Sequence, residues 1–159
     1  MATEQDTQTT GPIFAIQRVY TKDISFESPS TPQIFREAWQ PEVSLDLQTK
    51  TQALEEGTHE VVLSVTATAK QKDKIAFIVE IQQAGIFTLQ GFPEEQVRQA
   101  LGSMCPSILY PFAREAIASA VTHGGFPQLL LAPVNFEALY MQHLTAQSEK
   151  TDKAASMAN

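Results

Sequence analysis

Four segments in the first part of the chain alternate apolar and polar side chains with a period of two. Successive side chains of a β-strand point to opposite faces, so this alternation predicts strands with one buried and one wet face. The segments are 14–26, 43–49, 61–67 and 75–89. Short links between most of them favour an antiparallel meander. In the first segment we expect every even-numbered side chain from Phe14 to Phe26, Arg18 and Tyr20 included, on one face.

The periodicity changes after residue 104, where apolar residues recur at helical spacing. A helix is predicted from Cys105, with a stripe that includes Leu109, Phe112 and Ile117. Gly124-Gly125 should end this helix, because glycine accepts the left-handed cap conformation. Asn135 should cap a second helix. The predicted fold class is therefore α+β, a four-stranded antiparallel sheet with C-terminal helices packed on one face.

The segment between the predicted helices is unusual. Prolines at 127 and 133 make residues 126–133 a loop, yet almost all of its side chains are apolar. Loops normally run over the surface and are polar. Something must therefore cover this one: the protein's own core, a partner subunit or a ligand.

Length and charge limit the function classes. The 159 residues suit one ordered domain, expected at 13–147, with a disordered tail at 1–12 and a mobile tail at 148–159. A net charge of −7 argues against a nucleic-acid partner. No apolar run is long enough to insert in a membrane, and a single cysteine suits a reducing cytoplasm.

The polar phases of the four segments collect carboxylates with few lysines. They are Asp23, Glu27, Glu42, Asp46, Glu60 and Glu80. Either this is a solvated face that keeps an acidic protein soluble, or it is a docking surface for a basic partner, with Ile78 as an apolar contact.

The apolar inventory exceeds what one small sheet and two helices can hide. It includes nine phenylalanines and Trp39. Such a surplus indicates oligomer contacts or an open hydrophobic site. Catalytic patterns are weak, because His59, His123 and His143 have no metal-ligand spacing and Cys105 fits a packed thiol better than a nucleophile. These patterns predict neither a metal site nor a catalytic centre.

Several long motifs resemble the SecB protein-export chaperone family. They are residues 16–27 (IQRVYTKDISFE), 39–43 (WQPEV), 82–87 (QQAGIF), 105–115 (CPSILYPFARE), 126–129 (FPQL) and 131–136 (LAPVNF). The likeness runs in order from about Phe14 to Leu144. It implies a cytoplasmic holdase, with no enzyme activity and no cofactor, that keeps unfolded preproteins export-competent and hands them to the SecA motor. It also implies a homotetramer, built as a dimer of dimers.

The resemblance also assigns site residues. A groove for unfolded peptide would use Trp39, Val43, Leu45, Leu47, Phe77, Phe112, Phe126, Leu129, Leu131 and Tyr140. The basic, zinc-bearing C-terminal tail of SecA would dock on Asp23, Glu27, Ile78 and Glu80. The tetramer contact would include Val79, Ile81 and Gln83.

Three rival readings stay open at this stage. A relative of the same fold serves as a chaperone for a toxin–antitoxin pair. A cysteine-dependent hydrolase would need Cys105 exposed beside a histidine. A purely structural oligomer would show no affinity for unfolded polypeptide.

Overall fold

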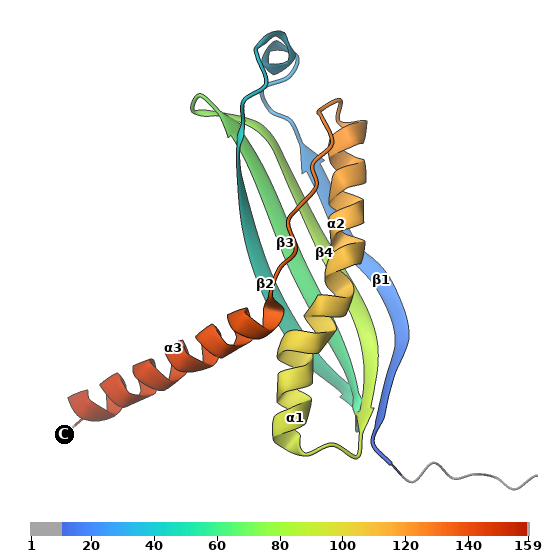
Figure 1. Cartoon of the computed structure of the whole chain (residues 1–159), viewed down its shortest axis with the longest axis vertical. Coiled ribbons are helices and arrows are strands. Elements are labelled where there is room, and N and C mark those ends of the chain that lie inside the picture. Colours follow the sequence, from blue (N-terminus) through green and yellow to red (C-terminus); the bar gives the residue numbers. More distant parts are fainter. Residues whose placement is uncertain (1–10, 159) are drawn as a thin grey trace, which may run out of the picture.

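A computed structural model describes residues 11–158 and confirms the α+β class (Figure 1). The expected disorder at the N-terminus falls mostly on residues 1–10, which lie outside the described residues. Four strands come first, followed by helices. The elements in order are β1 (Ile13–Glu27), a 3-10 turn η1 (Gln33–Arg36), β2 (Glu42–Glu55), β3 (Thr58–Gln71), β4 (Lys74–Gln90), α1 (Glu94–Gln99), a π-helical turn η2 (Ala100–Met104), α2 (Cys105–His123) and α3 (Phe136–Met157).

The strands form one antiparallel sheet in the order β1-β4-β3-β2. The meander therefore holds for β2, β3 and β4 only, and the expectation that β1 lies beside β2 is wrong. The link from β1, which contains η1, crosses the end of the sheet instead (Figure 1). This crossing lets β1 pack two aromatic rings against β4. Phe14 lies 6.0 Å from Phe87 and Phe26 lies 5.9 Å from Phe77, measured between ring centroids.

β1 does not alternate regularly along its length. Its register with β4 shifts between Ile16 and Arg18 and again between Thr21 and Asp23, so it contains two bulges. Each bulge inserts one extra residue and exchanges the faces of the side chains that follow. The expectation that all even-numbered residues share a face is therefore wrong for Arg18 and Tyr20. These two lie on the face opposite to Phe14 and Phe26.

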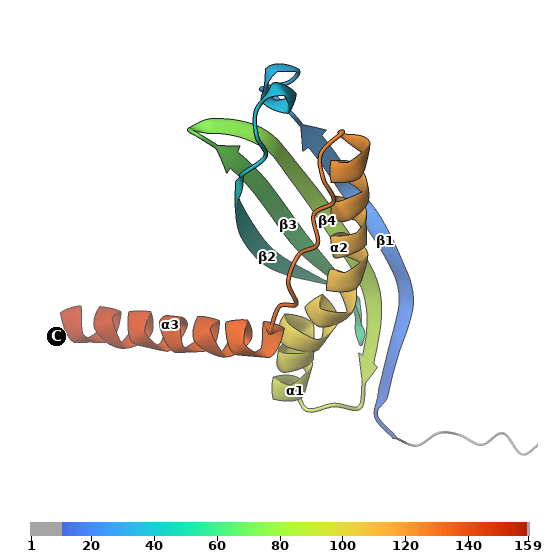
Figure 2. The same ribbon diagram turned by 45° about the horizontal axis from the view of Figure 1, so that its top comes forward.

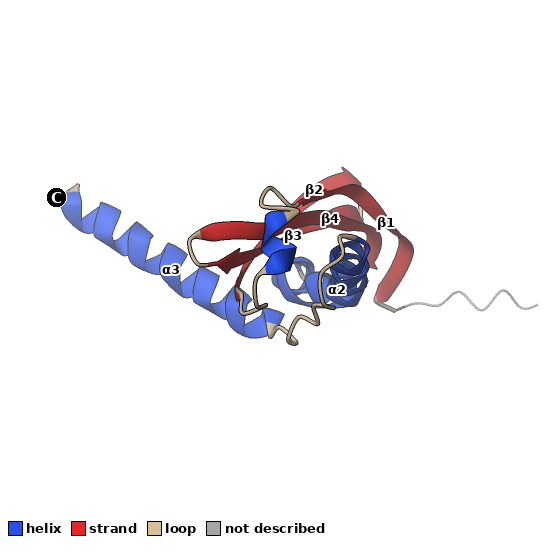
Figure 3. Cartoon of the chain, turned by 90° about the horizontal axis from the view of Figure 1, so that it is seen from above, coloured by secondary structure: helices blue, strands red, loops and turns tan. Residues whose placement is uncertain are grey.

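Helix α2 packs on one face of the sheet, which we call the covered face, mainly over β3 and β4. Seen from above, the sheet curls around α2, and no element of residues 11–158 lies over the other face, which we call the open face (Figure 3). The fully buried side chains of α2 include Leu109, Ile117 and Val121. They meet the fully buried Val61, Leu63 and Val65 of β3 and Val79 and Ile81 of β4 in one core.

The glycine pair ends α2 as predicted. Gly125 has φ +87°, the left-handed region that only glycine occupies without strain. Its N–H donates to the carbonyl of Thr122 (3.1 Å), and the N–H of Phe126 donates to the carbonyl of Val121 (3.2 Å). These two bonds form a Schellman motif, which satisfies carbonyls at the helix end and turns the chain back along the sheet.

Helix α3 begins at the predicted cap, where the side chain of Asn135 accepts a hydrogen bond from the N–H of Ala138 (3.0 Å). It then projects away from the sheet, with its base against η2 and Phe136 against Tyr110 of α2, so α2 is the helix that packs on the sheet (Figures 1 and 2). The helix runs to Met157, past the expected boundary at residue 147. Residues 148–157 contain no glycine or proline to stop it. None of the described helices has the length and apolar character to cross a bilayer.

Candidate functional site

The edge strand β2 carries an apolar ledge beside the core. Val43, Leu45 and Leu47 lie in register with Ala69, Ala67 and Val65 of β3, which are fully buried. The ledge residues therefore continue the covered face, but α2 does not reach them. As a result Val43 stays 43% exposed and Leu45 39% exposed, next to neighbours at 0%.

Five aromatic rings cluster at one end of the ledge. Phe126, at the start of the connection between α2 and α3, lies 5.1 Å from Phe77, 5.3 Å from Trp39 and 4.9 Å from Phe35 between ring centroids. Phe26 completes this aromatic cluster, 6.3 Å from Phe126. Because Phe77 shares a register row with Ala69 and Val43, the cluster and the ledge form one continuous apolar surface. Phe77 and Phe126 are buried, whereas Phe35 is 49% exposed.

The apolar connection is covered in part by the protein's own core. The hydroxyl of Tyr110 on α2 donates to the carbonyl of Ala132 (2.6 Å), and its ring packs on Phe136 at 5.6 Å. Leu131 is buried and Leu129 is half-buried, but Leu130 remains 62% exposed. The protein's own core therefore covers Phe126 and Leu131 and part of Leu129, whereas the other five residues of the connection, Leu130 among them, are left to solvent.

Two of the expected groove residues lie elsewhere. Phe112 is 50% exposed on α2. It follows Tyr110 by two residues, about 200° around the helix, so it points away from the connection. Tyr140 lies at the base of α3 against Gly102 of η2. The other eight expected groove residues lie on the ledge, in the aromatic cluster or in the connection.

The resemblance missed three residues that build this site, Phe26, Phe35 and Tyr110. Tyr110 belongs to a stripe with Pro106, Ala113, Ile117 and Val121, and all five are buried. The spacing 106-110-113-117-121 is a helical signal that was available in the sequence. For Phe26 and Phe35 no local signal places the two rings together.

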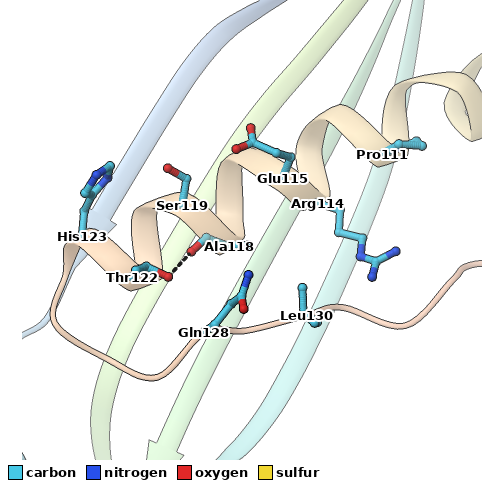
Figure 4. Close-up of a pocket in the computed structure, with 9 residues that line it drawn as sticks. All are labelled: Pro111, Arg114, Glu115, Ala118, Ser119, Thr122, His123, Gln128 and Leu130. Carbon is cyan, nitrogen blue, oxygen red and sulfur yellow. Dashed lines mark hydrogen bonds between the residues drawn. The ribbon is translucent and has the colours of Figure 1, made fainter.

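A cavity of about 460 Å³ opens between α2 and the connection (Figure 4). Arg114, Gln128 and Leu130 line its side toward the connection, whereas Glu115, Ser119 and His123 point the other way. The exposed Leu130 lies here, so the connection also presents an apolar side chain to this cavity.

The expected tetramer contacts Val79, Ile81 and Gln83 are buried within the single chain, at 0%, 0% and 4% exposure. They face α2, and the amide of Gln83 donates to the carbonyl of Tyr20 (3.1 Å) and accepts from the hydroxyl of Thr21 (3.1 Å). In this structure they are core residues of the single chain, and their expected contact with another subunit stays a prediction. An effect on assembly would have to pass through the packing of β1 and α2.

The open face brings together the four residues expected to dock SecA. Glu27 pairs with Ile78 across the β1–β4 ladder, and Ser25 pairs with Glu80 in the next row. Asp23 follows one row further, opposite Gln82. Two carboxylates, Glu27 and Glu80, thus flank one half-exposed isoleucine, and a third, Asp23, lies two rows away on the same face. The assignment of both phases to one face agrees with the register.

Glu60 lies at the other end of the open face in a polar network. Its carboxylate accepts hydrogen bonds from the hydroxyl of Tyr20 and from Lys22 Nζ, the latter at 3.1 Å. The Tyr20 hydroxyl, with a smaller contribution from Lys22, holds the pKa of Glu60 below its ordinary value. Burial and the nearby carboxylate raise the pKa of Tyr20 to about 12. Glu60 is therefore an ionised carboxylate whose charge Lys22 compensates, whereas Asp23, Glu27 and Glu80 have no ion-pair partner among the described residues.

The geometry does not support thiol chemistry. Cys105 is fully buried, and burial raises the pKa of its thiol to about 12. A nucleophilic cysteine needs the thiolate and access to substrate. Among residues 11–158, no three His, Cys, Asp or Glu side chains are grouped as metal ligands would be.

The fold and the site together define a binding protein, with a half-open apolar surface on one side of the sheet and a charged face on the other. The sequence model of the family described as "Preprotein translocase subunit SecB" matches residues 7–147. The chain is 54% identical over 138 residues to a protein of Hydrogenovibrio crunogenus named "Protein-export protein SecB", covering 87% of this chain and 93% of that protein. A protein of Methylococcus capsulatus with the same name is 52% identical over 141 residues, covering 89% of this chain and 91% of that protein. The chain belongs to the SecB family, whose members are chaperones for preprotein export.

A solved structure shares the fold. The SecB-like chaperone of Mycobacterium tuberculosis, in complex with a ChAD peptide from the HigA1 antitoxin, matches with a TM-score of 0.64 over 76% of this chain and 90% of that chain. The sequences are 14% identical, so this similarity shows the fold alone. A shared fold at this identity does not favour the toxin–antitoxin role over preprotein export.

Proposed function

We propose that this chain is a cytoplasmic holdase without enzymatic activity that binds unfolded preproteins on the ledge and the aromatic cluster. The observation that carries the proposal is the difference in exposure between β2 and β3 on the covered face. Val43 and Leu45 are about 40% exposed while their register neighbours are fully buried. Each 100 Å² of apolar surface that a client segment covers there contributes about 2.5 kcal/mol. Apolar burial depends little on the amino-acid sequence of the client, so many unfolded proteins can bind.

Long clients gain affinity from several such contacts on one chain. When one segment is bound, the next binds at a high effective concentration, so modest contacts combine into tight holding. Assembly as a homotetramer, a dimer of dimers, would multiply the binding surfaces in the same way. Exposed apolar side chains outside the ledge support assembly, among them Phe112 at 50%, Ile16 at 46% and Ile24 at 48%. No cofactor is required, because holding needs burial alone.

Val43→Asp is expected to weaken the holding of an unfolded precursor by at least about tenfold, because it removes about 1.5–3 kcal/mol of apolar burial and puts a charge on the ledge. The matched control is Ser44→Asp, one residue along on the open face of the same strand. Suppression of precursor aggregation measures holding, and native mass spectrometry checks that assembly is unchanged. Equal holding by the two variants would show that the ledge does not bind clients.

We further propose that the SecA motor docks on the open face through Asp23, Glu27, Ile78 and Glu80. The support is charge complementarity between these carboxylates and a basic segment such as the zinc-bearing tail of SecA. Docking and holding then use opposite faces of one sheet, so a bound client does not block the motor.

Glu80→Lys is expected to lower the affinity for SecA roughly three- to tenfold while precursor holding stays at the wild-type level. The control Glu56→Lys makes the same change in net charge in the β2–β3 turn, away from the face. Titration of labelled SecA at two salt concentrations measures the affinity. If the two variants bind SecA equally well, the docking assignment is wrong.

A further inference from the structure

The charges of the open face are separated into two zones along the strands. The three register rows through Ile78, Glu80 and Gln82 hold four carboxylates and no lysine or arginine. The carboxylates of this acidic zone are Asp23, Glu27, Asp46 and Glu80. Three cations and one carboxylate follow further along the strands. They lie in the rows through Ala84 and Ile86 and at Lys22, the bulge residue between these rows and the acidic zone. This basic zone contains Arg18, Lys22, Lys50 and Glu60.

Arg18 and Lys22 belong to the basic zone because of the two bulges in β1. Without them Arg18 would point to the covered face with Phe14. Lys22, the residue that the second bulge inserts, reaches over the open face to Glu60 at 3.1 Å. Because Tyr20 and Lys22 occupy the carboxylate of Glu60, the exposed Arg18 and Lys50 have no ion-pair partner among the described residues.

The far ends of the two zones act as separate charges in solution, although Lys22 and Asp23 are chain neighbours where the zones meet. From Glu80 to Ile86, the row of Arg18, the strand advances six residues, roughly 20 Å, which is more than twice the Debye length of about 8 Å at physiological salt. A partner segment therefore meets a negative field at one end of the face and a positive field at the other.

The middle of the face indicates the kind of partner. Its side chains are polar and half-exposed, among them Ser64, Thr66 and Gln82. Obligate interfaces between identical subunits have apolar centres, so a second copy of this chain fits this face poorly. A charged peptide segment that binds reversibly fits it better. The rows from Ile78 to Ile86 span roughly 27 Å, which suits about eight extended residues.

We infer that the open face recognises a bipolar peptide segment, whose lysines and arginines cover the acidic zone and whose carboxylates cover Arg18 and Lys50. The inference rests on the proposed docking role of this face and deepens it. The acidic zone attracts the partner, and the basic zone fixes the direction in which it lies and rejects segments that are basic throughout.

The test uses three synthetic peptides of equal length with a fluorescent label. One has lysines in one half and glutamates in the other, one has the same residues in alternating order, and one has lysines in both halves. Fluorescence anisotropy at low salt should show that the block peptide binds roughly three- to tenfold more tightly than the alternating one. In Arg18→Glu/Lys50→Glu that preference should disappear, and the all-lysine peptide should become the tightest binder.

The control Lys72→Glu/Lys150→Glu makes the same change in net charge off the face and should keep the wild-type order. Thermal unfolding checks that each variant folds. If Arg18→Glu/Lys50→Glu keeps the wild-type preference, or changes the native mass and leaves peptide affinity unaltered, the inference is overturned while docking on the acidic zone stands. Failure of the proposed function is a separate result, namely SecA binding that is unaffected by Glu80→Lys.

Discussion

Replacing Phe77 by alanine is expected to destabilise the folded chain by about 3–5 kcal/mol, the cost typical of removing a buried phenylalanine. The ring is 1% exposed and lies 5.9 Å from Phe26, 6.3 Å from Trp39 and 5.1 Å from Phe126. These partners come from β1, the β1–β2 link and the connection, so alanine leaves a cavity between three separate segments. Unfolding in urea, followed by tryptophan fluorescence from Trp39, measures the loss.

The matched control is Ile78→Ala, which removes an apolar side chain from the next position on the open face. It should cost less than about 1.5 kcal/mol, because that side chain is half-exposed and leaves no enclosed cavity. Similar costs for both variants would contradict the placement of Phe77 at the base of the cluster. A consequence follows for binding studies. A charged residue at 77 would abolish client holding by unfolding the protein, so Val43, on the surface, is the informative position.

Much of the fold could be predicted because the sequence signals it locally. β3 and β4 alternate without interruption over their central residues, and their odd-numbered positions from Val61 to Ala67 and from Phe77 to Ile81 are the buried ones. The Schellman motif at Gly125 and the cap at Asn135 are likewise properties of short segments. Each of these features depends on neighbours within a few residues.

The features that could not be predicted depend on distant pairings. Nothing within β1 states that it pairs with β4, about sixty residues away, or that its ladder contains bulges near Gln17 and Lys22. In the folded chain Gln17 is the extra residue of the first bulge, and its side-chain amide donates to the hydroxyl of Thr88 (2.6 Å). A bulge changes the face of every following side chain, so the basic zone of Arg18 and Lys22 could not be read from alternation.

The candidate site shows the same division. The acidic side chains and the ledge were predicted correctly as faces, since each is a phase of one strand. By contrast, Val79 and Ile81 share a phase with Phe77, and only the position of α2 decides that this phase is core. Phe112 and Tyr110 are a similar pair, because each fits a helical stripe and the fold shows that the stripe of Tyr110 is the buried one.

Gly102→Ala is expected to destabilise the chain by about 1–3 kcal/mol, although alanine is the better helix former. Gly102 lies in η2, and a Cβ there would be 2.5 Å from Cδ2 and 2.6 Å from Cε2 of the Tyr140 ring. The ring is part of the contact between the base of α3 and η2, which holds α3 to the rest of the fold together with the packing of Phe136 on Tyr110 of α2. The clash should therefore displace α3. Distances between spin labels on α3 and on the sheet should broaden in the variant.

The sign of the effect separates this steric cause from a change in helix propensity. In a Tyr140→Ala background the clash is absent, so Gly102→Ala should stabilise by about 0.5–1 kcal/mol through the lower entropy of the unfolded chain. The double-mutant cycle then gives a coupling energy of about 1.5 kcal/mol or more between positions 102 and 140. A single variant at 102 that stabilises the wild-type chain would show that Tyr140 moves aside freely. In that case η2 does not set the direction of α3, because the contact between Gly102 and the Tyr140 ring would contribute no free energy to holding the helix in place.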